Sequence, residues 1–336
     1  MKAIVQSAYG SPNALHLTDI DKPKVGDDDV LVRVQAAGVD PGVWHLTAGL
    51  PYMVRLMGLG LRAPKALVPG NDVAGRVEAV GKHVSRFRPS DEVYGRKPSG
   101  DGSFAEYVSV PAERLAAKPA NLTFEQAAAV PVSACTALQG LRDKGQVQPG
   151  QKVLVIGAGG GVGTFAVQLA KAFGAEVTGV CSTTKLDLVQ SLGADHVIDR
   201  TRGDFTDGTQ RYDIILDTAG NRPVSQLRRA LTDRGTLVIV GGEGGNRWSG
   251  GFGRQILRAP LLSAFVGQKL QALNAKLTAA DLEVLSGLIE AGKVTPAIDR
   301  TYPLAEAAEA IRYVHAGLAR GKVVVSVAEG VGETTA

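Results

Sequence analysis

A chain of 336 residues is long enough for about two domains, each with a core of its own. Its 44% apolar and 21% charged residues are typical of a globular protein, and no run of 18 apolar residues indicates a membrane span. The net charge of +4 comes without any block of five like charges, which gives little support to nucleic-acid binding.

The cysteines and the N-terminus indicate the compartment. Only Cys135 and Cys181 occur, and both lie in apolar segments, which favours a reducing environment without disulfides. The first ten residues lack the apolar core of a signal peptide. We therefore expect a cytoplasmic protein that does not cross a membrane.

Short alternating segments fill the first 120 residues. Those at 30–34, 72–80, 92–94 and 104–110 are separated by Gly, Pro and Asp. Alternation of this kind, interrupted by turn residues, is typical of antiparallel strands. It predicts a small, partly open β-barrel.

A glycine-rich turn follows the apolar strand 153–156. Ala158, Gly160 and Gly163 occupy the three fixed sites of a G-x-G-x-x-G pattern, with Gly159, Gly161 and Val162 between them. Residues without bulk let backbone N–H groups approach phosphate oxygens, and the helix that follows aims its positive end at the same anion. A merely flexible turn is the alternative, but the strand before it and the helical periodicity after it favour a dinucleotide site.

The next strand, 176–181, indicates which dinucleotide. An NAD site carries an Asp or Glu at its tip, whereas here Ser182, Thr183 and Lys185 follow. These side chains could donate to a 2′-phosphate, which favours NADPH, and Arg200 could add a second cation. A helix N-cap is an alternative role for Ser182 and Thr183, and an exposed arginine is equally plausible for Arg200.

Further strands at 196–199, 212–220 and 236–242 alternate with helical segments at 185–192 and 224–231, which predicts a doubly wound parallel sheet. Amphipathic helices at 281–291 and 305–314 and a strand at 322–327 then suggest a return to the first domain. We expect a first domain of residues 1–120 and 263–328, a nucleotide-binding domain of residues 121–262, and a disordered tail at 329–336.

Several segments in fixed order resemble the medium-chain dehydrogenase/reductase superfamily, in its zinc-independent, quinone-oxidoreductase-like branch. They are VLVRVQAAGV (30–39), PGNDVAGRVEAVG (69–81), DEVYG (91–95), GSFAEYV (102–108), AAAVPVSACTALQGL (127–141), AGGGVG (158–163), YDIILDTAG (212–220) and GKVVV (321–325). The resemblance implies an α/β fold in which a GroES-like barrel carries an inserted Rossmann domain.

Zinc-binding members of that superfamily place a cysteine and a His-Glu pair where this chain has Asp40 and Asn71-Asp72. The lobe with four closely spaced cysteines is also missing, and the five histidines are scattered. Because zinc prefers Cys and His ligands, we expect no metal. Without a Lewis acid, acceptors that delocalise the incoming charge are favoured, so we expect NADPH to reduce a quinone or an α,β-unsaturated carbonyl.

The resemblance also implies the site residues. Asp40 stands where relatives often carry an Asn that contacts the nicotinamide ribose or the substrate, and Thr136 falls in a segment that flanks the nicotinamide. Trp44, His45 and Tyr52 lie in a segment that covers the substrate, with Tyr52 a donor to an oxyanion. The alternatives are packing for Trp44 and solvent exposure for His45.

The expected catalytic residues are thus Asp40, Tyr52 and Thr136. The cofactor-binding set comprises Thr136, Ala158, Gly159, Gly160, Gly161, Val162, Gly163, Ser182, Thr183, Lys185, Arg200, Ala219, Gly220, Val240, Gly241, Gly242 and Lys322. For Lys322 a solvated side chain is the favoured alternative.

Two other functions remain open. One is a metal-independent alcohol dehydrogenase or carbonyl reductase. The other, suggested by the unusual Asp40, is an NADPH-binding sensor or structural protein without turnover. Relatives are commonly dimers, which implies a homodimer.

Overall fold

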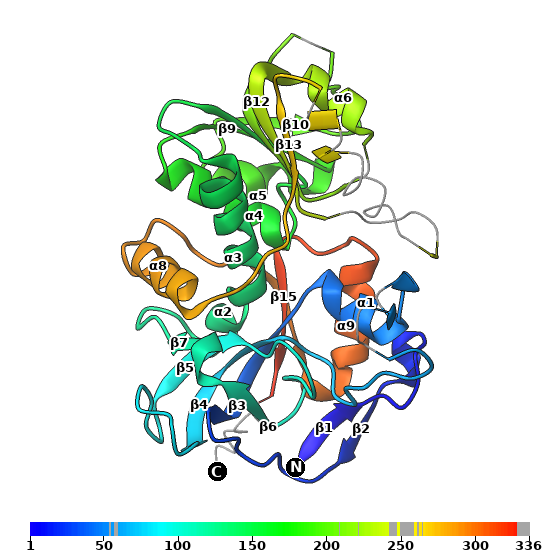
Figure 1. Ribbon diagram of the computed structural model, residues 1–336, viewed down its shortest axis with the longest axis vertical. Helices are drawn as coiled ribbons and strands as arrows, with labels where there is room; N and C mark the ends of the chain where they lie inside the picture. The colour runs from blue at the N-terminus through cyan, green and yellow to red at the C-terminus, as the bar shows by residue number, and fades with distance from the viewer. Residues whose placement is uncertain are drawn as a thin grey trace, which may run out of the picture.

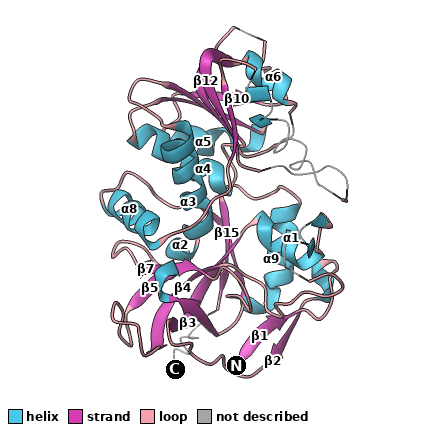
Figure 2. Ribbon diagram, in the orientation of Figure 1, coloured by secondary structure: helices cyan, strands magenta, loops and turns pink. Residues whose placement is uncertain are grey.

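The computed structural model describes residues 1–53, 55–56, 60–207, 209–220, 222–241, 247–248, 259–260, 262–263 and 265–327. Figure 1 shows two units, a barrel-like unit that holds the N-terminus and a second unit built on a parallel sheet. Helices cover both faces of that sheet, as Figure 2 shows. The predicted α/β fold is confirmed. The predicted tail at 329–336 lies outside the described residues.

The barrel unit contains two groups of strands, which are antiparallel except for the parallel pair β14 and β15. A hairpin is formed by β1 (Lys2–Val5) and β2 (His16–Asp19). The larger sheet has the order β14-β15-β3-β4-β5-β7, and β6 pairs with the first residues of β3 on the edge that β15 also occupies. Its strands are β3 (Asp29–Val39), β4 (Asp72–Val80), β5 (Glu92–Arg96), β6 (Tyr107–Pro111), β7 (Leu115–Ala117), β14 (Ile298–Pro303) and β15 (Lys322–Ser326). Because β15 pairs with β3, the chain does return to its first unit.

The second unit is a six-stranded parallel sheet in the order β10-β9-β8-β11-β12-β13. Its strands are β8 (Lys152–Ile156), β9 (Glu176–Cys181), β10 (His196–Asp199), β11 (Tyr212–Asp217), β12 (Leu231–Ile239) and β13 (Lys269–Ala272). The order reverses between β8 and β11, and ligands of such sheets bind beyond the carboxyl ends of the strands at that point.

The edge strand β13 corrects the predicted domain boundary. It pairs in parallel with β12, although its residues follow position 262, beyond which the sequence predicts the barrel unit. Leu270 alone of its four residues is fully buried, so the segment lacks the long apolar run that identified the other strands.

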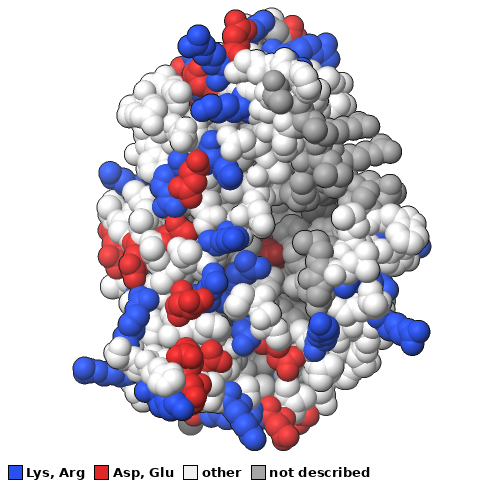
Figure 3. All heavy atoms as spheres, viewed as in Figure 1, with Lys and Arg blue, Asp and Glu red and all other residues white. Residues whose placement is uncertain are grey.

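Helices fill the space around and between the sheets. They are α1 (Pro41–Ala48), α2 (Phe124–Ala128), α3 (Pro131–Leu138), α4 (Gly161–Ala172), α5 (Leu186–Ser191), α6 (Val224–Arg229), α8 (Ala279–Glu290) and α9 (Ala307–His315). Among the described residues no helix is long and apolar enough to cross a membrane. On the face drawn in Figure 3, basic and acidic side chains are mixed.

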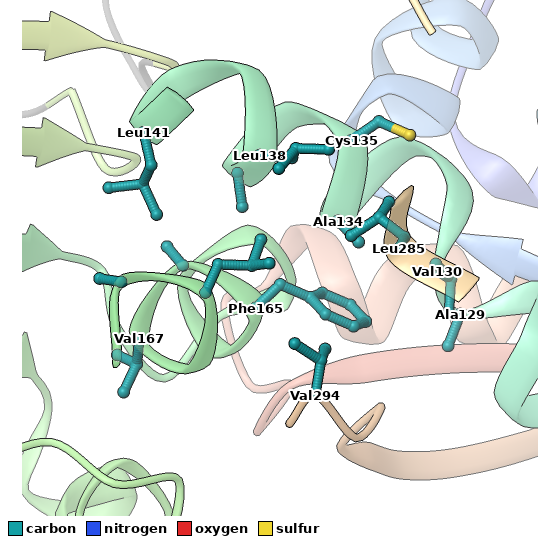
Figure 4. Close-up of a cluster of buried hydrophobic side chains, with 14 of the residues drawn as sticks. Ala129, Val130, Ala134, Cys135, Leu138, Leu141, Phe165, Val167, Leu285 and Val294 are labelled. Carbon is teal, nitrogen blue, oxygen red and sulfur yellow. The ribbon is translucent and has the colours of Figure 1, made fainter. Parts of the chain in front are cut away.

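A shared hydrophobic core joins the two units. Figure 4 shows Leu138 of α3, Phe165 of α4 and Leu285 of α8 converging in it. Phe165 is completely buried, and the same cluster reaches Tyr94 of the barrel sheet. A buried side chain of this size stabilises the fold by about 1.5–3 kcal/mol. One continuous apolar core therefore holds the two units together.

Candidate active site between the two units

The glycine turn between β8 and α4 depends on missing side chains. Gly157 has φ of 81°, a left-handed conformation that glycine adopts without strain. A Cβ on Gly163 would lie 2.1 Å from the carbonyl oxygen of Gly157 and 2.7 Å from Cα of Ala158. The first turn of α4 therefore packs directly against the backbone of the loop.

The N-terminus of α4 is open to an anion. Its N-cap, Gly160, provides no side-chain hydrogen bond. Within the described chain, the backbone N–H groups of Gly161, Val162 and Gly163 have no acceptor. A Cβ on Gly160 would meet its nearest neighbour only at 3.4 Å. Three free donors at the positive end of a helix fit a pyrophosphate group.

The start of β15 supports the same turn from behind. Gly321 N–H donates to the carbonyl of Gly159 at 3.0 Å, and Gly160 and Gly321 form an isolated parallel bridge. The side chain of Lys322 is 1% exposed, so the expectation that it is solvated was wrong. Figure 1 shows β15 running from the barrel sheet up to the level of α4, which explains this burial.

Lys185 lies against the turn but its ammonium is largely engaged. Its Nζ donates to the carbonyls of Ala319 at 2.5 Å and Gly317 at 3.2 Å. Burial lowers the pKa of Lys185, and nearby Arg200 and Arg320 act in the same direction. A lysine has three donors, so one N–H remains for a phosphate. Arg320 is a cation of this group that the sequence did not indicate.

A carboxylate lies nearer to the tip of β9 than expected. Asp199, the last residue of β10, pairs in register with Cys181 and accepts a hydrogen bond from Thr183 Oγ1 at 2.6 Å. Hydrogen bonds from Thr183 and Thr201 lower the pKa of Asp199 to about 2. The tip of β9 therefore has a carboxylate on the neighbouring strand, which the sequence of β9 itself does not reveal. Ser182 stands at the N-cap position of the short helical turn that follows, but its side chain makes no capping hydrogen bond, and Arg200 is exposed.

At the tip of β11 the backbone turns inward. The N–H groups of Ala219 and Gly220 donate to Asp217 Oδ1, at 3.2 and 2.9 Å. Burial raises the pKa of Asp217 to about 6, and its Oδ2 has no hydrogen-bond partner. Val240 and Gly241 follow β12 beside this tip, whereas Gly242 lies outside the described residues.

The positions that hold zinc ligands in other members carry two buried carboxyl groups. Asp40 caps α1 through Oδ1, which accepts from Gly42 N–H at 2.7 Å, and its Oδ2 is buried without a partner. Asp72 Oδ1 accepts from Val132 N–H at 3.0 Å. The described part of the chain contains no group of three His, Cys, Asp or Glu side chains placed to hold a metal.

Trp44 and His45 are engaged within their own unit. The indole stacks on His315 of α9, with ring centroids 3.7 Å apart, so that face of Trp44 is covered. His45 Nδ1 lies 2.8 Å from the carbonyl oxygen of Leu50, and the ring is half-buried. One face of Trp44 is thus used for packing, as the alternative expected. His45 is half-buried rather than fully exposed to solvent.

Tyr52 contacts residues 247 and 248, which follow β12 of the second unit. Its ring lies edge-on to Trp248, with centroids 5.4 Å apart, and its backbone N–H donates to the carbonyl of Arg247 at 2.8 Å.

Thr136 lies on α3. Its hydroxyl donates to the carbonyl of Val132 at 2.6 Å and can still accept a hydrogen bond. Trp248 was not among the predicted site residues, because it stands in a glycine-rich loop without a recognisable pattern.

Comparisons with known proteins agree with this geometry. Residues 26–120 match the alcohol dehydrogenase GroES-like domain family, and residues 192–325 match the zinc-binding dehydrogenase family. The 2-methylene-furan-3-one reductase of Solanum lycopersicum is 34% identical over 97% of this chain and 79% of its own. The chain belongs to the medium-chain dehydrogenase/reductase superfamily, in its quinone-oxidoreductase-like branch.

Two other members are similar over nearly the whole chain. The chloroplastic NADPH-dependent alkenal/one oxidoreductase of Arabidopsis thaliana is 35% identical, over 97% of this chain and 79% of that protein. The structure of the quinone oxidoreductase from Coxiella burnetii superposes with a TM-score of 0.85 at 28% identity, covering 98% of this chain and 99% of the other. The order of barrel and Rossmann units is thus that of the superfamily.

Proposed function

We propose that this protein is an NADPH-dependent reductase that transfers hydride to a quinone or an α,β-unsaturated carbonyl. The observation that carries the proposal is the uncapped N-terminus of α4, with three free N–H donors at the carboxyl end of β8. Similar proteins named for NADPH, alkenals, enones and quinones indicate the cofactor and the acceptor class.

The cofactor supplies a hydride when it is bound. Gly161, Val162 and Gly163 would hold its pyrophosphate, and Lys185 and Arg200 would meet the 2′-phosphate. Asp40 Oδ2, which lacks a partner, would accept from a ribose hydroxyl. Thr136 would accept from the nicotinamide amide. Ala219, Gly220, Val240 and Gly241 would line the cofactor site at the carboxyl ends of β11 and β12.

On the acceptor side, the hydroxyl of Tyr52 would donate to the oxygen on which negative charge develops. The contact between Tyr52 and Trp248 would exclude water from the acceptor. The uncovered faces of Trp44 and His45 would contact the acceptor. The proton that completes the reduction would come from solvent.

An acceptor panel tests this function. NADPH is expected to be consumed with at least one quinone or enone, and the rate is expected to survive a metal chelator. Tight NADPH binding without turnover of either class would contradict the proposal and indicate a sensor. Formation of NADPH from NADP⁺ and an alcohol would indicate an alcohol dehydrogenase instead.

Lys185→Glu is expected to lower the preference for NADPH over NADH by about 10-fold or more. A carboxylate there would repel the 2′-phosphate and would also lose the two carbonyl contacts of the lysine. The ratio of kcat/KM for the two cofactors measures this. Lys269→Glu, on β13 at the opposite edge of the sheet, is the matched control and should leave the ratio unchanged. An unaltered ratio in Lys185→Glu would remove that residue from the 2′-phosphate site.

A homodimer in the cytoplasm is proposed as well. The family resemblance supports the dimer, together with the exposed Phe265 and Leu262 near the edge strand β13. A monomeric mass in sedimentation analysis would contradict the dimer.

A further inference from the structure

A buried polar cluster lies next to the glycine turn. It consists of Asp72 at the start of β4, Ser133 on α3 and Lys322 on β15, and we call it the Asp72 cluster. Lys322 Nζ lies 3.1 Å from Ser133 Oγ and 3.6 Å from Asp72 Oδ2. Asp72 is 0% exposed and Lys322 is 1% exposed. The cluster joins the barrel sheet to the helix that supports the nucleotide-binding unit.

The side chain of Lys322 lies against the glycine turn. A Cβ on Gly161, the first residue of α4, would lie 3.1 Å from Lys322 Cδ and 3.2 Å from Ser133 Oγ. The residue before Lys322 is hydrogen-bonded to Gly159. A phosphate held by the free N–H groups of α4 would therefore lie close to the charge that compensates Asp72.

Asp72 is incompletely compensated. Its Oδ1 accepts from Val132 N–H, but its Oδ2 has no hydrogen-bond partner although it is buried. Burial raises the pKa of Asp72 to about 7, Lys322 and Arg96 oppose this increase, and Asp40 adds to it. Among the described residues, the thiol of Cys135 on α3 also interacts with Asp72, and burial raises the pKa of that thiol well above its ordinary value.

We propose that binding of the dinucleotide at the glycine turn drives uptake of a proton by Asp72 at Oδ2. The negative pyrophosphate shares the charge of Lys322, so the ionised form of Asp72 loses part of its compensation. An O–H bond forms with a proton from solvent, and no other bond changes. This inference rests on the dinucleotide site of the proposed function and is independent of the acceptor.

Linkage then requires a pH-dependent affinity. The pKa of Asp72 is about 7 in the free protein and would be higher in the complex. Binding of NADPH therefore weakens as the pH rises from the first of these two values to the second. Below this range Asp72 is protonated in both states and contributes no pH dependence. The same coupling means that protonated Asp72 favours a bound cofactor.

Calorimetric titration with NADPH in buffers of different ionisation enthalpy measures the protons exchanged on binding. At about pH 7.5, wild-type protein is expected to take up about half a proton more than Asp72→Asn, for a rise of about one pKa unit on binding. Protons exchanged by NADPH itself contribute equally to both proteins, so they cancel when the uptake of the variant is subtracted from that of the wild type. Asp281→Asn is the control, because hydrogen bonds from Arg142, Gln139 and Thr278 hold the pKa of Asp281 below its usual value.

Equal proton uptake by wild type and Asp72→Asn would overturn the inference. Infrared difference spectra of the wild type provide a readout that needs no variant: NADPH should increase the absorption of protonated carboxyl groups. No such increase would overturn the inference too, even if Asp72→Asn failed to fold. Failure of turnover with every acceptor would contradict only the proposed function, whereas an absence of NADPH binding would contradict both.

Discussion

Gly163→Ala is expected to weaken NADPH binding by about 100-fold or more, equivalent to about 2.7 kcal/mol. The added Cβ would lie 2.1 Å from the carbonyl oxygen of Gly157 and 2.7 Å from Cα of Ala158. Both obstacles are backbone atoms, so α4 must move away from the loop, and its free N–H groups would no longer converge on the pyrophosphate. Calorimetric titration measures the loss.

The same substitution should also lower the free energy of unfolding by about 1–3 kcal/mol, because the overpacked turn strains the start of α4. Gly287→Ala is the matched control. Gly287 lies inside α8, where a Cβ would meet nothing within 4 Å. That variant should bind NADPH normally and be stabilised by about 0.5–1 kcal/mol. Unchanged NADPH affinity in Gly163→Ala would show that the turn is not the phosphate site.

Lys322→Met is expected to cost about 3–5 kcal/mol of stability at about pH 8.5, and clearly less at about pH 6. Removing the lysine leaves Asp72 buried beside Asp40 without its nearest cation. The native-state pKa of Asp72 is already raised to about 7, above its unfolded value, so ionisation destabilises the native state as pH rises. In the variant that pKa rises further, and below it the carboxyl group is neutral.

Denaturant unfolding at both pH values measures this effect. The double variant Asp72→Asn/Lys322→Met should recover part of the loss at high pH, since no unpaired charge remains. A loss of equal size at both pH values, without recovery in the double variant, would show that Lys322 contributes packing rather than charge compensation.

The elements with long periodic patterns could be predicted from the sequence. The strand 153–156, the turn and α4 were recognised because an apolar run, glycines and helical spacing follow one another directly. The edge strand β13 was missed because its four residues, KLQA, carry little pattern of their own. Its place is set by pairing with β12, which local sequence does not reveal.

The site was harder to predict, because its contacts join distant segments. Asp199 approaches Thr183 through the register of β10 on β9, and Lys322 is buried because β15 ends against the glycine turn. Asp72 stands inside a motif that identified the superfamily, yet its pairing with Lys322 across 250 positions of sequence depends on the fold. Charged residues that meet only in the folded chain have no characteristic spacing in the sequence, so the sequence alone does not predict their pairing.

Deuterium transfer is the most direct measurement of the proposed hydride transfer. NADPH that carries deuterium at both hydrogens of the nicotinamide C4 should deliver one deuterium to the β-carbon of an enone, detected by mass spectrometry and NMR of the product, with or without a chelator. A reduced enone without deuterium at its β-carbon, or no reduced product with enones and quinones alike, would contradict hydride transfer to a conjugated acceptor.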